Sequence, residues 1–121
     1  MFVSACGSDG KVSLRDIKIS DADGTVTFTV RNDSDKDIYF EPVYTVQKRS
    51  FLSWSEIENK QDYNVPTHYY TCEAGSETSY TLPWPLKYSS VDSGNYRMAI
   101  AYGYSNPPEK MYTMHREFEL K

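Results

Sequence analysis

The feature that most constrains the fold of this chain is a period-two alternation of apolar and polar residues, repeated in short runs. In the clearest run, Val26, Phe28 and Val30 face one way and the threonines between them face the other. Such alternation is typical of half-buried β-strands. No segment keeps apolar residues at helical spacing over three turns, so the sequence predicts no long helix.

About seven such runs follow one another at spacings of roughly 8–12 residues, separated by turn-forming residues. This pattern predicts an all-β fold, an antiparallel β-sandwich of about seven strands. The apolar positions change parity between Leu14 and Ile17, which predicts a β-bulge near Arg15 and Asp16. Even-numbered apolar positions over residues 38–46 predict one further strand, with Pro42 at an edge or a bulge.

The buried faces of these strands predict a single hydrophobic core. Cys72 shares parity with Tyr70 and is expected to be buried as a small hydrophobic residue. The predicted core comprises Val26, Phe28, Val30, Phe40, Tyr44, Val46, Trp54, Leu82, Trp84, Tyr96, Met98, Ile100, Phe118 and Leu120.

The length of 121 residues is enough for one domain and too short for two. Residues 1–10 are small and rich in Gly and Ser, and we expect them to form a flexible tail ahead of a domain at residues 11–121.

The 13 Lys and Arg residues against 17 Asp and Glu give a net charge of −4. An acidic chain is repelled by polyphosphate, so no nucleic-acid partner is expected. We expect the domain to be a monomer.

The tail contains a short motif that predicts a lipid anchor. Val3-Ser4-Ala5-Cys6 matches the site at which bacterial prolipoproteins are cleaved before a lipidated cysteine. Residues 7–10 would then form the tether, and the membrane would be contacted only through Cys6. A working signal has a basic region and an apolar region of about 7–15 residues, whereas only Met1 and Phe2 precede the motif. Either the sequence begins within the signal or the match is chance. The prediction is an extracytoplasmic, membrane-anchored lipoprotein. A Cys6–Cys72 disulfide is an alternative that needs the tail to fold back.

From about Val12 to Lys121 the chain resembles the bacterial immunoglobulin-like domains of extracytoplasmic proteins. The matching segments, in order, are Thr25–Asn32 with its polar turn, Tyr44–Lys48 followed by Trp54, Gly75–Glu77 before Tyr80–Trp84, Gly94–Arg97, and Glu117–Leu120. The resemblance implies an immunoglobulin-like sandwich and a non-catalytic surface module without a defined ligand. Unlike antibody domains, the chain has no cysteine on the strands around Phe28 and Met98, so packing must hold the two sheets together.

The sequence offers no constellation for catalysis or metal binding. His68 and Cys72 are separated by roughly 13 Å on a strand, too far to share a metal, and His115 is expected to be exposed. Asp33-x-Asp35-x-Asp37 begins like a calcium loop, but the sixth and twelfth positions are Ile and Tyr, so we interpret it as a solvated turn. No nucleophile elbow, P-loop or dinucleotide fingerprint is present. We therefore predict no enzyme activity, no cofactor and no metal site.

Aromatic residues are the remaining functional signal, since 11 tyrosines occur in the chain. Trp54, Tyr63, Tyr69 and Tyr104 are candidates for an exposed ligand patch, because aromatic side chains supply rigid, amphipathic contact area. The leading hypothesis is a structural or protein-interaction module that engages an envelope or extracellular protein. The alternative is a carbohydrate-binding or protease-inhibitory sandwich that uses these loop aromatics and the Ser105–Pro108 segment. The other possibility for the tyrosines is that they cover sheet faces.

Overall fold

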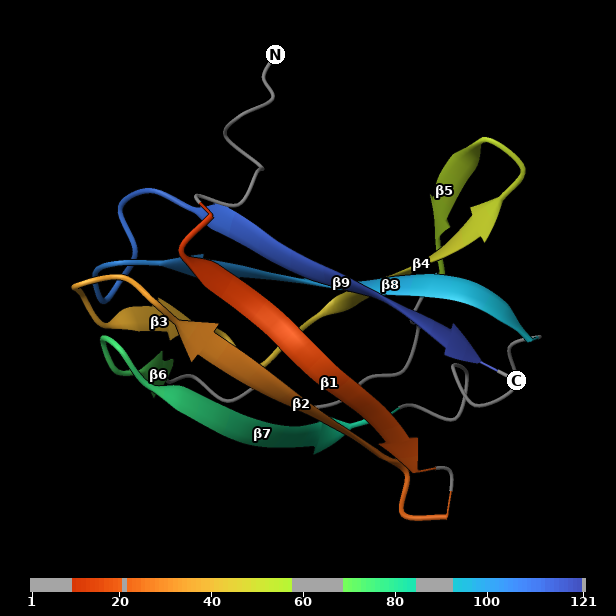
Figure 1. Ribbon diagram of the computed structural model, residues 1–121, viewed down its shortest axis with the longest axis horizontal. Coiled ribbons are helices and arrows are strands. Elements are labelled where there is room, and N and C mark those ends of the chain that lie inside the picture. Colours follow the sequence, from red (N-terminus) through yellow and green to blue (C-terminus); the bar gives the residue numbers. More distant parts are fainter. Residues whose placement is uncertain (1–9, 21, 58–68, 85–92, 121) are drawn as a thin grey trace.

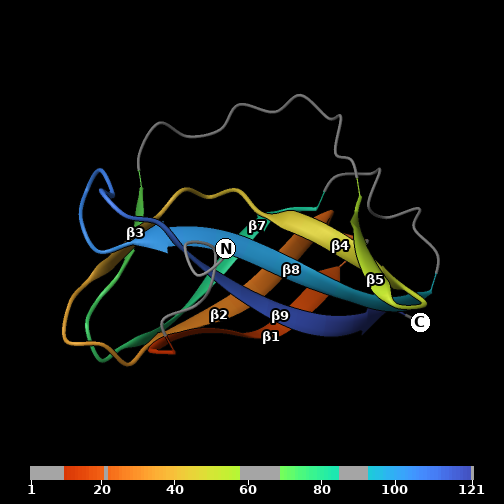
Figure 2. The same ribbon diagram turned by 90° about the horizontal axis from the view of Figure 1, so that it is seen from above.

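The computed structural model describes residues 10–20, 22–57, 69–84 and 93–120, and these form an all-β structure. Two antiparallel sheets pack against each other, as Figure 1 and the view from above in Figure 2 show. The predicted fold class, an immunoglobulin-like antiparallel sandwich, is confirmed. The strands are β1 (Val12–Ser20), β2 (Thr25–Asn32), β3 (Ile38–Phe40), β4 (Thr45–Ser50), β5 (Ser53–Glu56), β6 (Tyr70–Cys72), β7 (Glu77–Pro83), β8 (Gly94–Gly103) and β9 (Tyr112–Leu120).

Strand β8 lies at the centre of the larger sheet. One edge of β8 pairs with β9 from Gly94 to Tyr102. The other edge of β8 pairs with β4 near the beginning of β8 and with β3 near the end of β8. Strands β5 and β6 extend this sheet beyond β4 and β3. The smaller sheet has the order β1-β2-β7. The described residues contain no helix that would be long and apolar enough to cross a membrane.

The β-bulge predicted in the first strand is confirmed. Arg15 pairs with Thr29 and Lys18 pairs with Thr27, so Asp16 and Ile17 together face the single residue Phe28. Asp16 takes a φ of 54°, in the left-handed region. The extra residue reverses the parity of β1, which is why the apolar side chains before and after it all turn toward the core.

The predicted strand over residues 38–46 is present but interrupted. Strands β3 and β4 lie along the same edge of β8, and residues 41–44 between them, including the buried Pro42, have no place in the ladder. The register shifts by two residues across this gap, since Tyr39 faces Gly103 and Thr45 faces Ala99. A shift of two preserves parity, so the even-numbered side chains remain on the buried face on both sides of the gap.

The core contains most of the predicted residues. Trp54 was predicted wrongly: it is half-exposed, because β5 pairs with β4 in a hairpin that projects from the sandwich (Figure 1). Phe118 and Leu120 are half-buried at the margin of the core. The buried hydrophobic residues are Val12, Leu14, Val26, Phe28, Val30, Ile38, Phe40, Tyr44, Val46, Cys72, Leu82, Trp84, Tyr96, Met98, Ile100, Tyr102 and Met114.

Aromatic contacts join the two sheets. Trp84, at the end of β7, stacks on Tyr44 with ring centroids 6.2 Å apart, and the Tyr44 hydroxyl donates a hydrogen bond to the Pro83 carbonyl (2.6 Å). Tyr80 meets Phe40 edge-on at 5.1 Å, and its hydroxyl donates to the Thr71 carbonyl. Burial raises the pKa of Tyr80. Cys72 is a fully buried free thiol, as its parity predicted, whereas Cys6 lies outside the described residues.

Candidate ligand-binding site

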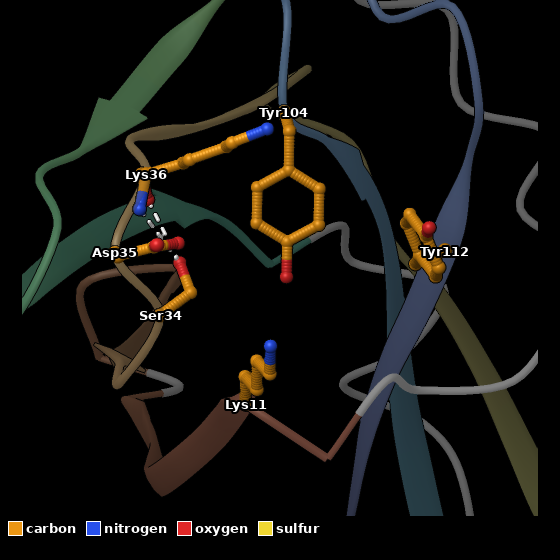
Figure 3. A pocket seen from close by; sticks show the side chains of 6 residues that line it. All are labelled: Lys11, Ser34, Asp35, Lys36, Tyr104 and Tyr112. Carbon is orange, nitrogen blue, oxygen red and sulfur yellow. Dashed lines mark hydrogen bonds between the residues drawn. The ribbon is translucent and has the colours of Figure 1, made fainter.

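A shallow pocket lies at the end of the sandwich where β8 finishes. Three segments meet there: the residues just before β1, the connection from β2 to β3, and the connection from β8 to β9. Its volume is about 410 Å³, and an adjoining hollow adds Ser105, Glu109 and Lys110 to its rim. The pocket is lined by Lys11, Ser34, Asp35, Lys36, Tyr104 and Tyr112 (Figure 3).

Tyr104 and Tyr112 form one wall of the pocket and pack on the buried Tyr102. Tyr102 and Tyr112 pair across β8 and β9, and their rings stack with centroids 5.7 Å apart. Tyr104 meets both rings edge-on, at 6.0 Å from Tyr102 and 5.5 Å from Tyr112. In Figure 3 the Tyr104 ring lies between residues 34–36 and Tyr112, and its hydroxyl is directed toward the amino group of Lys11. The pocket is therefore built on a rigid aromatic base.

Gly103 allows the β8–β9 connection to lie against the end of β8. A Cβ atom at this position would lie 2.4 Å from the Cβ of Pro108 and 2.8 Å from the carbonyl oxygen of Lys110. Both distances are shorter than any normal contact, so only glycine fits between the strand and the connection. This close approach brings Tyr104 back beside Tyr112.

Asn32 holds the opposite wall of the pocket. It is the last residue of β2 and is fully buried. Its Nδ2 donates to the carbonyls of Lys36 (2.8 Å) and Cys72 (3.0 Å), and its Oδ1 accepts from the backbone and the hydroxyl of Ser34. All four hydrogen-bonding positions of the amide are thus used. This network sets the path of the segment that carries Ser34, Asp35 and Lys36.

Hydrogen bonds at the surface stabilise the rest of the connection from β2 to β3. Arg31 Nε donates to Asp33 Oδ1 at 2.7 Å, and this hydrogen bond raises the pKa of the Arg31 guanidinium. The Asp37 carboxylate accepts from the backbone of Ala74 at 2.9 Å. The three aspartates of the apparent calcium motif therefore do not converge on one point. Across the described ranges, no three His, Cys, Asp or Glu residues are placed to hold a metal ion.

The chemistry of the pocket suits a polar ligand with anionic groups. Lys11 and Lys36 offer ammonium donors, and the Tyr104 hydroxyl can donate or accept. Asp35 is the acidic member of the lining, and Lys110 lies over the Tyr112 ring with its Nζ 5.2 Å from the centroid. The arrangement can hold a ligand by charge, hydrogen bonds and ring contacts.

The structure separates the residues predicted to form a patch. Tyr104 lies in the pocket, Tyr69 is half-buried just before β6, and Tyr63 falls outside the described residues. Trp54 lies beside Arg97, whose guanidinium carbon is 4.6 Å from its ring centroid. Arg97 and Gly103 are six residues apart on β8, roughly 20 Å of strand, so Trp54 and Tyr104 are at opposite ends of the sandwich.

Sequence reasoning missed the lysines and Asn32. A signal for this end of the molecule did exist, since Gly103 lies between two tyrosines and the segment from 105 to 108 has turn chemistry. Lys11 and Lys36 gave no such signal, because each looks like an ordinary solvated lysine until the fold brings them together. His115 is exposed, as its parity predicted.

The comparisons with known proteins address the family and the fold. The sequence profile described as "Bacterial Ig-like domain" matches residues 8–119. Among solved structures, the chain is similar to a β-glucosidase involved in saponin metabolism from intestinal bacteria, with 14% identity and a TM-score of 0.41. That match covers 91% of this chain but only 16% of the glucosidase chain. No curated protein matches the chain.

Proposed function

The chain belongs to the bacterial Ig-like domain family, and from this we propose that it is a non-catalytic module of the bacterial cell envelope that engages a protein partner. The family membership is the observation that carries the proposal, because domains of this family are generally non-catalytic and commonly extracellular or surface-exposed. We place the partner contact at the pocket, where three loops converge on one end of a rigid sandwich.

The compartment forms part of the same proposal. Cys6 would carry the lipid that anchors the module outside the cytoplasm, with residues 7–10 as a short tether. Lys11 lines the pocket, so the pocket would lie near the anchored end of the domain. The mass of the Cys6-containing peptide from the native protein tests this. An acyl modification supports the anchor, and an unmodified Cys6 behind an intact upstream sequence refutes it.

A second candidate function is carbohydrate binding at the same pocket. The observation that favours it is the half-buried Tyr104 ring beside the Lys11 and Lys36 ammonium groups. Aromatic rings and hydrogen-bond donors of this kind suit the apolar faces and hydroxyls of sugars, and the lysines would favour acidic sugars.

The test uses the 121-residue chain as immobilised bait for an envelope extract, followed by cross-linking and titration with the purified partner. Replacing both Lys36 and Tyr104 by alanine should weaken binding roughly tenfold or more, as expected for central interface residues. The exposed β1 residue Lys18 provides the control, and Lys18→Ala should bind like the unmodified chain.

Three results would change the assignment. Cross-links confined to regions away from the pocket would show that the partner contact lies elsewhere. Saturable glycan binding on an array, lost on Tyr104→Ala without any protein partner, would favour the carbohydrate function. Hydrolysis of a substrate, abolished by a single carboxylate substitution, would overturn both.

A further inference from the structure

The β4–β5 hairpin ends in two apolar side chains that face solvent. Phe51 is 92% exposed and Leu52 is 86% exposed, whereas the remaining exposed large hydrophobic residue of the described chain, Met111, is 42% exposed. Figure 1 shows this hairpin projecting from the body of the sandwich. Single exposed apolar residues are common on protein surfaces, but two adjacent ones at the tip of a projecting hairpin form a small exposed apolar patch.

Folding does not account for these two residues. Ser50 pairs with Ser53, so Phe51 and Leu52 form a two-residue turn, and Phe51 takes a φ of 38°. Two-residue turns of this kind favour Asn and Gly, which adopt positive φ at little cost. Phenylalanine adds backbone strain at this position, and neither side chain gains burial in return. A role outside the folded domain would explain their presence.

Positive charge lies directly beneath the tip. Lys48 and Arg49 precede the turn, and the one acidic residue of β4 and β5, Glu56, lies opposite Gln47 at the end of the hairpin away from the tip. The chain as a whole has a charge of −4. Arg97 lies over the half-exposed Trp54 ring, and Lys48 Nζ lies 5.9 Å from the Tyr96 ring centroid. The hairpin therefore presents an apolar tip on a cationic base.

We propose that the Phe51–Leu52 tip inserts into the interfacial layer of an anionic phospholipid bilayer. The basic residues would then lie at the level of the negatively charged headgroups, and Trp54 would occupy the polar–apolar boundary that its amphipathic ring prefers. A convex tip of two residues offers much less area than the roughly 800 Å² per partner of a stable protein interface. A bilayer needs no complementary shape, so it fits this feature better than a protein does.

This contact is separate from the pocket. The tip lies at the beginning of β8 and the pocket at its end. If Cys6 anchors the pocket end, insertion of the tip would add a second attachment and place the long axis of the domain along the membrane. Two weak membrane signals together give the stable binding that one alone does not.

The test measures sedimentation of the unacylated 121-residue chain with vesicles of phosphatidylcholine alone or mixed with phosphatidylglycerol. The chain should bind the mixed vesicles. The double variant Phe51→Ser, Leu52→Ser should partition roughly tenfold more weakly or worse, because it loses the inserted apolar area. Lys48→Gln with Arg49→Gln should reduce binding to mixed vesicles and its dependence on salt.

Two controls accompany these variants. Met111→Ser removes an exposed apolar residue elsewhere and should bind like the unmodified chain. The Lys36→Ala, Tyr104→Ala variant should also bind vesicles fully, so that failure of the pocket proposal and failure of this one are distinguishable. The tip variants should unfold at an unchanged denaturant concentration, because both side chains are exposed.

The proposal is overturned if the unmodified chain does not bind the mixed vesicles, or if it binds them equally with serine at both tip positions. A tip-dependent dimer in sedimentation velocity, without vesicle binding, would assign the tip to contacts between copies of this chain. Tip-dependent binding of a purified protein in place of vesicles would overturn it equally.

Discussion

At the scale of single residues, Asn32 shows how one side chain can shape a site that it does not enter. Its amide joins the end of β2, the following connection and β6 through four hydrogen bonds inside the core. Buried polar groups are tolerated only when they are satisfied in this way. The network places Ser34 and Lys36 on the pocket wall, so Asn32 is a positioning residue for the pocket.

Asn32→Asp keeps the shape of the side chain but replaces the Nδ2 donor with an acceptor facing two carbonyl oxygens. We expect the free energy of unfolding to fall by about 2–4 kcal/mol, because those carbonyls lose their donor and a carboxylate is buried. Urea titration measures the change. Asp35→Asn, an exposed isosteric change in the same connection, should stay within about 0.5 kcal/mol. A similarly small effect of Asn32→Asp would show that the hydrogen-bond network of Asn32 contributes little to the free energy of unfolding.

At the scale of elements, irregularities in two strands keep the apolar faces aligned with the core. The bulge at Asp16 inserts one residue and changes the parity of β1. The gap between β3 and β4 inserts two residues and leaves parity unchanged. In both places the side-chain pattern follows the buried face across the irregularity, because a strand side chain can reach the core only on alternate positions.

The bulge makes a specific prediction at Asp16, whose left-handed conformation is normally taken by glycine. Asp16→Val should lower the free energy of unfolding by about 1–2 kcal/mol, since a β-branched residue is strained there. Asp16→Gly should be neutral or slightly stabilising. Thermal and urea unfolding of the pair measure the difference. Lys18→Val, in regular strand geometry, provides the comparison. If Lys18→Val lowered the free energy of unfolding as much as Asp16→Val, the loss would come from placing valine on β1 and not from strain at the bulge.

At the scale of the whole molecule, the two sheets are held together by packing. Trp84 and Tyr44 stack across the interface at an interplanar angle of 6°, and Tyr80 lies between Phe28 on its own sheet and Phe40 on the other. Because Cys72, the cysteine of the described residues, is a free thiol, the stability of the sandwich depends strongly on the aromatic contacts.

Trp84→Ala should therefore lower the free energy of unfolding by about 3–5 kcal/mol, through lost burial and the cavity that remains. The side chain is only 3% exposed. The chain contains its own control in the other tryptophan: Trp54→Ala should cost about 1 kcal/mol or less, because that ring lies outside the core and contacts Arg97. Guanidinium titrations of both variants give the comparison, and equal losses would contradict the assignment of Trp84 to the inter-sheet core.

The sequence by itself determined most of the strands, the bulge in β1 and much of the core, because each depends on the local alternation of side chains. The predicted core left out Val12, Leu14, Ile38, Tyr102 and Met114, which the structure buries. Val26, Phe28 and Val30 can be assigned to one face without knowing what packs against them. The burial of Cys72 and the exposure of His115 followed from the same parity.

The tertiary structure decided everything that depends on which segments meet. Lys11, Lys36 and Tyr104 are distant in sequence, and only the antiparallel order of the sheets brings them to one end. Trp54 has the same apolar character as Trp84, yet one projects on a hairpin and the other is enclosed between sheets. Local periodicity states which side of a strand is apolar, but burial requires a second surface, and that surface is supplied by residues elsewhere in the chain.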